Sequence, residues 1–226
     1  MGTSENIVTV ADLRAAEART MREVPEDVLM DRAAVAVADA AVGLASERGL
    51  PLERLGVCVV AGPGNNGGDA LLAGALLAGR GALVVAVAVG DRVHERGARL
   101  LAEAAGPGAL SGVDFPLGRE RVLDADLVID GFSGIGGRLG LPDAAYGILG
   151  RAVDAGRPIV AVDVPSGLAA DSAEVPARDS PDAPPRHVVA DVTVTFTAPK
   201  RCLVEAPASA AAGRVVVADV GIDLEG

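Results

Sequence analysis

The chain has 226 residues, so one domain or a small pair is expected, and 50% of its residues are hydrophobic, which excludes an intrinsically disordered chain. The formal net charge of −11 and the aromatic content of 2% argue against nucleic-acid binding, which needs clustered Lys and Arg for phosphates and aromatic rings for bases. The same charge argues against an anionic membrane surface, so small-molecule chemistry is the remaining class.

The start of the chain predicts two helices. Apolar residues recur at helical spacing over residues 9–20, and again from Pro25, which suits a first helical turn, to a stop near Gly49. We expect these N-terminal helices, within residues 9–48, to pack on the sheet of a single domain spanning residues 1–226. Neither a leader segment nor a membrane span is expected, so a cytoplasmic protein without a membrane partner is predicted.

From Leu55 onward, predicted strands alternate with predicted helices. Short buried strands are predicted over residues 55–61, 83–89, 126–130, 158–163, 191–196 and 214–220, and helices over residues 68–80, 94–104 and 143–155. The strands are continuously apolar, which is typical of a parallel sheet covered on both faces. The predicted fold class is therefore α/β, a Rossmann-like three-layer α/β/α sandwich with a mostly parallel central sheet. The Pro-rich stretch over residues 173–186 is interpreted as a mobile surface loop.

Polar residues beside glycines follow three of these strands. Residues 62–69 (GPGNNGGD) follow the first strand, Asp130 and the glycine-rich residues 131–137 follow the third, and residues 163–167 (DVPSG) follow the fourth. Ligands of an open parallel sheet bind outside the carboxyl ends of its strands. The three segments therefore predict one shared binding site.

The first segment allows more than one interpretation. Residues 62–67 match G-x-G-x-x-G, and Asp91 ends the next strand, where a ribose-binding acid would lie. A P-loop is excluded because no Lys follows Gly67. Asp69 would repel a pyrophosphate at the start of the following helix, so it either caps that helix or takes part in a different site. Asn65 and Asn66 supply amide groups for a ribose, an amide or a cation.

Asn66, Asp130 and Ser166 together offer hard oxygen ligands, which favour an alkali or alkaline-earth cation over zinc or iron. Asp163 lies outside that set and is left for proton transfer. A structural alternative stays open for each of these residues, because a strand-end carboxylate or hydroxyl can simply cap the next turn.

The other candidates carry weaker signals. Lys200 follows a strand end and either reaches an anionic group or is solvated. His94 and His187 are expected to be solvated, and Cys58 and Cys202 to be buried reduced thiols.

In this order, the segments resemble the NAD(P)H-hydrate epimerase family, also called the YjeF N-terminal domain. The resemblance extends over nearly the whole chain and rests on residues 61–69 (AGPGNNGGD), Asp130 with 134–136 (GIG), 162–167 (VDVPSG), 193–200 (TVTFTAPK) and 218–222 (ADVGI).

The resemblance implies an isomerase that interconverts the R and S forms of hydrated NADH and NADPH, which carry a hydroxyl at C6 of the nicotinamide ring. It implies Asp163 as the catalytic residue, which protonates the leaving hydroxyl and then acts as a base. The substrate contacts it implies are Asn65, Asn66, Gly67, Gly68, Asp69, Gly134, Ile135, Gly136, Gly137, Arg138, Leu139, Gly140, Asp163 and Lys200. It also implies a potassium ion at Asn66, Asp130 and Ser166, a homodimer, and a dehydratase domain or partner that acts on the product.

Two departures from the family pattern bear on loop conformation and substrate binding. Ala70 stands where the family usually has glycine, and Arg138 is displaced from the usual basic position. Two rivals stay open: a Rossmann-type NAD(P)-dependent oxidoreductase, suggested by the glycine pattern and Asp91, and a non-catalytic binding scaffold of the same fold.

Overall fold

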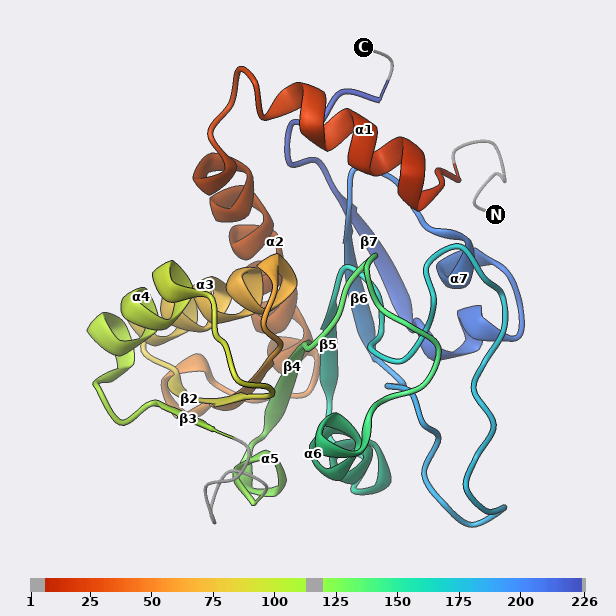
Figure 1. Ribbon diagram of the computed structural model, residues 1–226. Coiled ribbons are helices and arrows are strands. Elements are labelled where there is room, and N and C mark those ends of the chain that lie inside the picture. Colours follow the sequence, from red (N-terminus) through yellow and green to blue (C-terminus); the bar gives the residue numbers. More distant parts are fainter. Residues whose placement is uncertain (1–6, 113–119, 225–226) are drawn as a thin grey trace.

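The computed structural model describes residues 7–112 and 120–224 and contains a seven-stranded sheet with helices on both faces (Figure 1). The strands are β1 (Gly56–Ala61), β2 (Leu83–Ala88), β3 (Leu110–Gly112), β4 (Leu127–Gly131), β5 (Ile159–Val162), β6 (Val192–Phe196) and β7 (Arg214–Ala218). Their order is β3-β2-β1-β4-β5-β6-β7, and every neighbouring pair is parallel. The predicted three-layer α/β fold is confirmed.

Two helical layers bury the two faces of the sheet. The helices are α2 (Glu26–Glu47), α3 (Asn65–Gly79) and α4 (Glu95–Ala105) on one face, and α5 (Arg121–Asp124) and α6 (Asp143–Asp154) on the other (Figure 1). Alternate residues of a strand point to opposite layers: Val57 and Val59 of β1 pack in the core beneath α2 and α3, whereas Cys58 and Val60 pack with α6. Because both faces are buried, the strands are apolar along their whole length.

The two N-terminal helices occupy different places. The buried stripe of α2 is rich in alanine, including Ala34, Ala38 and Ala41, so this helix approaches α3 and strands β4 to β6 closely. In contrast, α1 (Val10–Thr20) lies over the ends of the strands, where the Val10 amide donates to the Asp171 carboxylate at 2.9 Å (Figure 1). Of the predicted pair, therefore, α2 packs on the sheet face, while α1 lies at the edge where the loops gather.

Three short elements complete the described fold. None of the helices within the described residues is long and apolar enough to cross a membrane. The remaining elements are α7 (Arg201–Val204) and the 3-10 turns η2 (Leu52–Arg54) and η3 (Ala208–Ala211).

The structure corrects the predicted boundaries at two informative points. Helix α3 begins at Asn65 rather than near Gly68, because Gly67 and Gly68 are packing sites: a Cβ on Gly67 would lie 2.0 Å from the Gly62 carbonyl oxygen, and one on Gly68 2.6 Å from Met30. Strand β5 ends at Val162, because Asp163 has a φ of 66°, which turns the chain out of the strand. The three-residue strand β3 was not predicted, since its sequence is too short to show a period.

The strand order places a crevice between β1 and β4. The chain leaves β1 through α3 towards β2, whereas β4 continues in the other direction to β5. At such a switch point the two connections diverge and leave room for a ligand beyond the carboxyl ends of the strands. The polar segments after β1 and β4 therefore flank one opening, and the segment after β5 lies next to it.

Candidate active site

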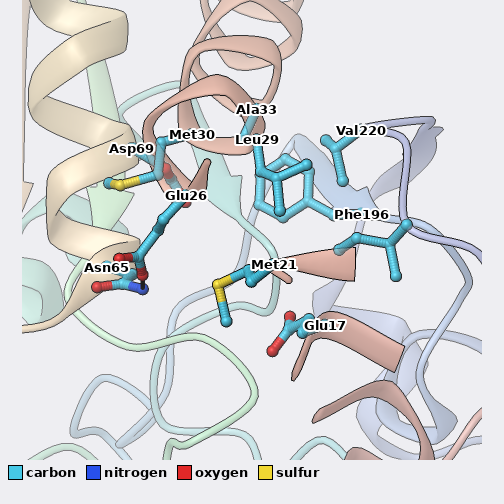
Figure 2. A pocket seen from close by; sticks show the side chains of 11 residues that line it. Glu17, Met21, Glu26, Leu29, Met30, Ala33, Asn65, Asp69, Phe196 and Val220 are labelled. Atoms are coloured by element: carbon cyan, nitrogen blue, oxygen red, sulfur yellow. Dashed lines mark hydrogen bonds between the residues drawn. The ribbon is translucent and has the colours of Figure 1, made fainter. Parts of the chain in front are cut away.

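Two adjoining cavities lie at this edge of the sheet. The larger, called here the loop cavity, has a volume of about 420 Å³ and is lined by Arg14, Glu17, Pro63, Gly64, Asn65, Asn66, Asp69, Asp163, Phe196 and residues 132–137. The smaller, called here the apolar cavity, has a volume of about 120 Å³ and is lined by Glu17, Met21, Glu26, Leu29, Met30, Ala33, Asn65, Asp69, Phe196, Val220 and Ile222 (Figure 2). Glu17, Asn65, Asp69 and Phe196 belong to both, so the cavities share a wall.

Asp163 is held in the loop cavity by three donors. Its Oδ2 accepts from the Ile135 amide at 2.9 Å, and its Oδ1 accepts from Thr195 Oγ1 at 3.2 Å and forms an ion pair with Lys200 Nζ at 2.7 Å. The side chain is 6% exposed and its backbone is in the left-handed region, which is unfavourable for a residue with a Cβ. Three fixed donors and a strained backbone specify where this carboxylate points.

Lys200 is buried beside Asp163. It is 1% exposed, and its Nζ also donates to Thr195 Oγ1 at 2.7 Å and to the Phe196 carbonyl oxygen at 2.9 Å. The alternative of a solvated Lys200 is therefore wrong, and the anionic group that it reaches is the Asp163 carboxylate. A contact between Lys200 and substrate stays a prediction, and Lys200 does not line either cavity.

Asp130 and Ser166 form a second buried pair, which contacts Ser133 of the loop cavity. Ser166 Oγ donates to Asp130 Oδ1 at 2.6 Å, the Ser166 amide donates to Oδ2 at 2.9 Å, and the Ser133 amide donates to Ser166 Oγ at 2.9 Å. Asp130 is fully buried and forms no ion pair with any residue of the described chain. Burial raises the pKa of its carboxyl to about 6, although the hydrogen bonds from Ser166 and Phe132 oppose that shift.

Asn66 joins the two pairs through Gly134. A Cβ built on Gly134 would lie 2.7 Å from Asp163 Oδ2 and 2.8 Å from Asn66 Oδ1, so both oxygens crowd around the same glycine. Ser133 and Ile135, on either side of it, contact Ser166 and Asp163. The structure thus brings Asn66, Asp130, Asp163 and Ser166 together, as their positions after β1, β4 and β5 predict.

The residues predicted to hold potassium fit a cation by their chemistry. Asp130 is a buried carboxylate that lacks a cationic partner in residues 7–112 and 120–224. Amide, carboxylate and hydroxyl oxygens are ligands for hard cations. No group of three or more His, Cys, Asp or Glu side chains that suits a metal occurs in the described residues, so any ion here would depend on these mixed oxygen donors.

Asp69 is not a helix cap. It lies in the second turn of α3, whose N-cap is Gly64 and has no side-chain capping bond. The side chain is 8% exposed, and Oδ1 is buried without a hydrogen-bond partner. Burial, and then the nearby charges of Asp163, Glu26 and Glu17, raise the pKa of Asp69 well above its ordinary value.

The structure brings only part of the predicted glycine-rich loop into the site. Residues 132–137 line the loop cavity, whereas Arg138, Leu139 and Gly140 line neither cavity. The Gly140 amide instead donates to the Gly167 carbonyl oxygen at 2.9 Å, which ties the loop to the segment after β5. Arg138 is exposed, and its contact with substrate stays a prediction.

Several residues of the site were not singled out as site residues from the sequence. Arg14 and Glu17 come from α1, and Glu26 from α2 accepts a hydrogen bond from Asn65 Nδ2 (Figure 2). Phe196 lines both cavities. The spacing of Arg14 and Glu17 on one side of α1 was the available signal, but it does not reveal that α1 lies over the strand ends. Burial, and then the charge of Asp163, raise the pKa of Glu17.

Only one of the two histidines contradicts the prediction of solvated side chains. His187 is buried, with 8% exposure, whereas His94 is half-buried and its Nδ1 accepts from the Gly97 amide at 3.2 Å, which caps α4. Both cysteines are buried and free, as predicted. Burial, followed by the charge of Arg178, lowers the pKa of His187.

Comparison with known proteins identifies relatives of the whole chain. Residues 26–202 match the family model described as YjeF-related protein N-terminus. A protein of Microbacterium testaceum called NAD(P)H-hydrate epimerase is 42% identical over 220 residues, covering 95% of this chain and 78% of its own length. Another of that name from Clavibacter michiganensis subsp. michiganensis is 37% identical, covering 96% and 90%. The bifunctional NAD(P)H-hydrate repair enzyme Nnr of Corynebacterium glutamicum is 37% identical over 96% of this chain, which spans only 39% of that enzyme's length.

A solved structure supports the fold. The crystal structure of the yeast protein ynu0 (YNL200c) superposes with a TM-score of 0.73 over 93% of this chain and 86% of the yeast chain, at 22% sequence identity. The family model covers more than half of the chain, and relatives above 30% identity extend along nearly all of it. The chain therefore belongs to the family of YjeF-related N-terminal domains.

Proposed function

We propose that the protein is an NAD(P)H-hydrate epimerase, an isomerase that interconverts the R and S hydrates of NADH and NADPH. The observation that carries this proposal is the convergence of Asn66, Asp163 and the Asp130–Ser166 pair around residues 131–137, at the switch point of the sheet. Relatives 36–42% identical to the chain bear that enzyme name. Together, these findings favour a catalytic domain over a non-catalytic scaffold.

The geometry suits a reaction at one carbon of a bound ring. The loop cavity has room for a ring, and the Asp163 carboxylate reaches it on a fixed support of Ile135, Thr195 and Lys200. Inverting the carbon that carries the hydroxyl requires breaking and remaking its C–O bond, with proton transfer to and from oxygen. A positioned carboxylate accelerates such transfers by about 10²–10⁴-fold.

We propose that a potassium ion binds Asn66, Asp130 and Ser166. When bound, the ion would supply a fixed positive charge beside the buried Asp130 carboxylate. The Ser133 amide contacts Ser166 and the Ile135 amide contacts Asp163, so the ion would also steady the loop that positions Asp163. Two observations support this site: the three residues supply oxygen donors, and Asp130 has no cationic partner among the described residues.

The oxidoreductase alternative has no support in the site. Asp91, the acid that would bind ribose, is exposed and lines neither cavity. The buried Asp69 stands in the second turn of α3, close to where a dehydrogenase would place its pyrophosphate.

The activity can be tested by proton NMR on an NADH hydrate sample enriched in one epimer. The purified protein should speed the approach to the R/S equilibrium, and replacing potassium by tetramethylammonium should slow it. Oxidation or reduction of the nicotinamide ring in place of epimerisation would contradict the proposal.

Asp163→Asn should lower the rate of epimer exchange by about 10²–10⁴-fold, because the carboxylate that transfers a proton is removed. The affinity for the hydrate should stay within a few-fold, since the amide keeps the shape of the side chain. The rate is measured by NMR and the affinity by equilibrium dialysis. Asp91→Asn serves as the matched control and should retain full activity; full activity in Asp163→Asn would refute the role.

We propose that the protein is a cytoplasmic homodimer. Val28 and Val35 lie seven residues apart on α2 and are 38% and 43% exposed, an apolar strip that a second copy would bury. Light scattering coupled to size exclusion tests the dimer.

The fusion of this domain within bifunctional repair enzymes supports a dehydratase as the partner that acts on the product.

A further inference from the structure

Two carboxyl groups face the loop cavity from separate elements and have opposite surroundings. Asp163, after β5, has an ammonium, a hydroxyl and an amide donor around its oxygens. Asp69, on α3, has a buried Oδ1 without any hydrogen-bond partner, although its side chain lies on the wall shared by both cavities (Figure 2). The oxygens of Asp163 are therefore held by three donors, one of them a cation, whereas the buried Oδ1 of Asp69 has no donor in the described chain.

The charges around Asp69 reinforce this contrast. Three further acids face it, Asp163 from the loop, Glu26 from α2 and Glu17 from α1, and each raises its pKa in addition to burial. The nearby Lys200 is paired with Asp163. Arg14 lines the loop cavity from α1, but its side chain is exposed and makes no ion pair with a described residue. No cation in the described chain therefore offsets a negative charge on Asp69.

Apolar side chains of the apolar cavity also lie next to Asp69. Met21, Leu29, Met30 and Phe196 line the apolar cavity next to Asp69 (Figure 2). Apolar neighbours disfavour the ionised form of a carboxyl group. Two carboxyl groups whose surroundings favour different protonation states are the arrangement by which enzymes separate acid from base.

We propose that Asp69 is the general acid of the epimerisation and that Asp163 is the base, an assignment that rests on the proposed function. It divides between two residues the roles that the sequence interpretation gave to Asp163 alone.

With these two groups, every proton and electron pair of the epimerisation can be accounted for. Asp69 gives its proton to the C6 hydroxyl, the C6–O bond breaks with its electron pair, and water leaves while the ring nitrogen lone pair forms a C6=N1 iminium bond. Water then adds to the other face of C6, the iminium electron pair returns to nitrogen, and Asp163 takes the proton of the added water. Water that adds to a cationic carbon is acidic enough for a carboxylate to accept its proton. Solvent returns one proton from Asp163 to Asp69.

The main test is Asp69→Asn, which keeps the size and the neutral state of the buried side chain. We expect the exchange rate at pH 7 to fall by about 10²–10⁴-fold, with hydrate affinity within a few-fold of wild type. In the wild type the rate should fall at alkaline pH as Asp69 ionises, and this limb should be absent in the residual activity of Asp69→Asn. Asp91→Asn, on an exposed loop, should leave both rate and pH profile unchanged.

A second variant tests the role of Asp69 as an acid while leaving Asp69 in place. Glu17→Gln deletes one of the negative charges that raise the pKa of Asp69, so the alkaline limb should move to lower pH. A purely structural Asp69 would give no such shift. Carbon-13 NMR of labelled aspartate carboxyls, assigned by the signal lost in Asp69→Asn, should show that Asp69 is protonated at pH 7.

The outcomes separate this inference from the proposed function. If Asp69→Asn keeps the wild-type rate and profile while Asp163→Asn is inactive, the assignment is overturned and the epimerase stands. If the wild type does not exchange the epimers, the proposed function itself fails. If Asp69→Asn does not fold, Asp69→Glu is used in its place to identify the carboxyl signal of Asp69. If that signal shows that wild-type Asp69 ionises below pH 6, the role of Asp69 as the general acid is overturned.

Discussion

The site contains two buried carboxylates that the fold compensates in different ways. On the β5–β6 side, Asp163 faces the ammonium of Lys200 at 2.7 Å, and both side chains are nearly inaccessible to solvent. On the β4 side, Asp130 receives only the hydroxyl and amide of Ser166 and a long contact from the Phe132 amide at 3.3 Å. One side carries its own cation, whereas the other is short of one positive charge.

This difference separates positioning from ion binding. A built-in ammonium at 2.7 Å fixes the direction of the Asp163 carboxylate. A carboxylate with neutral donors has spare lone pairs and unbalanced charge, which is what a potassium site requires. Residues 133–135 connect the two sides, so the state of the Asp130 side can reach Asp163 through a few backbone bonds.

The largest expected effect comes from removing the built-in cation. Lys200→Met leaves the Asp163 charge buried without its partner and should destabilise the protein by about 3–5 kcal/mol, measured by urea unfolding. The double variant Lys200→Met with Asp163→Asn removes both charges and should recover much of that loss. Equal losses in the single and double variants would show that the pair does not couple.

A smaller effect is expected from potassium on the Asp130 side. At pH 7 a saturating concentration of potassium should stabilise the wild type by about 1–3 kcal/mol relative to tetramethylammonium, through binding to the folded state only. Asp130→Asn should lose that gain, measured by thermal unfolding in the two salts. A gain of the same size in Asp130→Asn would place the ion elsewhere.

The potassium effect should also depend on pH. The pKa of Asp130 is raised to about 6, so without the ion the folded state takes up a proton more readily than the unfolded chain, and stability falls as the pH rises from about 4 through 6. Potassium should offset this loss above about pH 6, where Asp130 is ionised, and have little effect at pH 4.5.

Features of the fold and the site that depend on local sequence could be predicted, whereas those that depend on contacts between distant parts of the chain could not. The parallel sheet follows from local apolar runs, and the meeting of Asp130, Asp163 and Ser166 follows from their positions directly after strands. The burial of Lys200 could not be predicted, because it depends on Asp163, which follows β5, whereas Lys200 itself follows β6. Capping stayed open as an alternative for Asp69 because the Asn-Asn-Gly-Gly stretch favours a loop, whereas packing of Gly67 against Gly62 starts the helix earlier and puts Asp69 in its second turn.

The smallest expected effect concerns the backbone that joins the two sides. Gly134→Ala would place a Cβ 2.7 Å from Asp163 Oδ2 and 2.8 Å from Asn66 Oδ1, so both oxygens or the loop itself must move. Gly134 is not in the left-handed region, and alanine therefore fits its backbone. We expect exchange to slow about tenfold with unchanged unfolding, since a small displacement of a catalytic group is costly for rate and not for folding. Gly43→Ala on α2, where nothing lies within 4 Å of the added methyl, is the control and should keep full activity. A Gly134→Ala enzyme with wild-type exchange and potassium response would mean that the two carboxylates act without this connection, and that the Asp130 side stabilises the fold without reaching the chemistry.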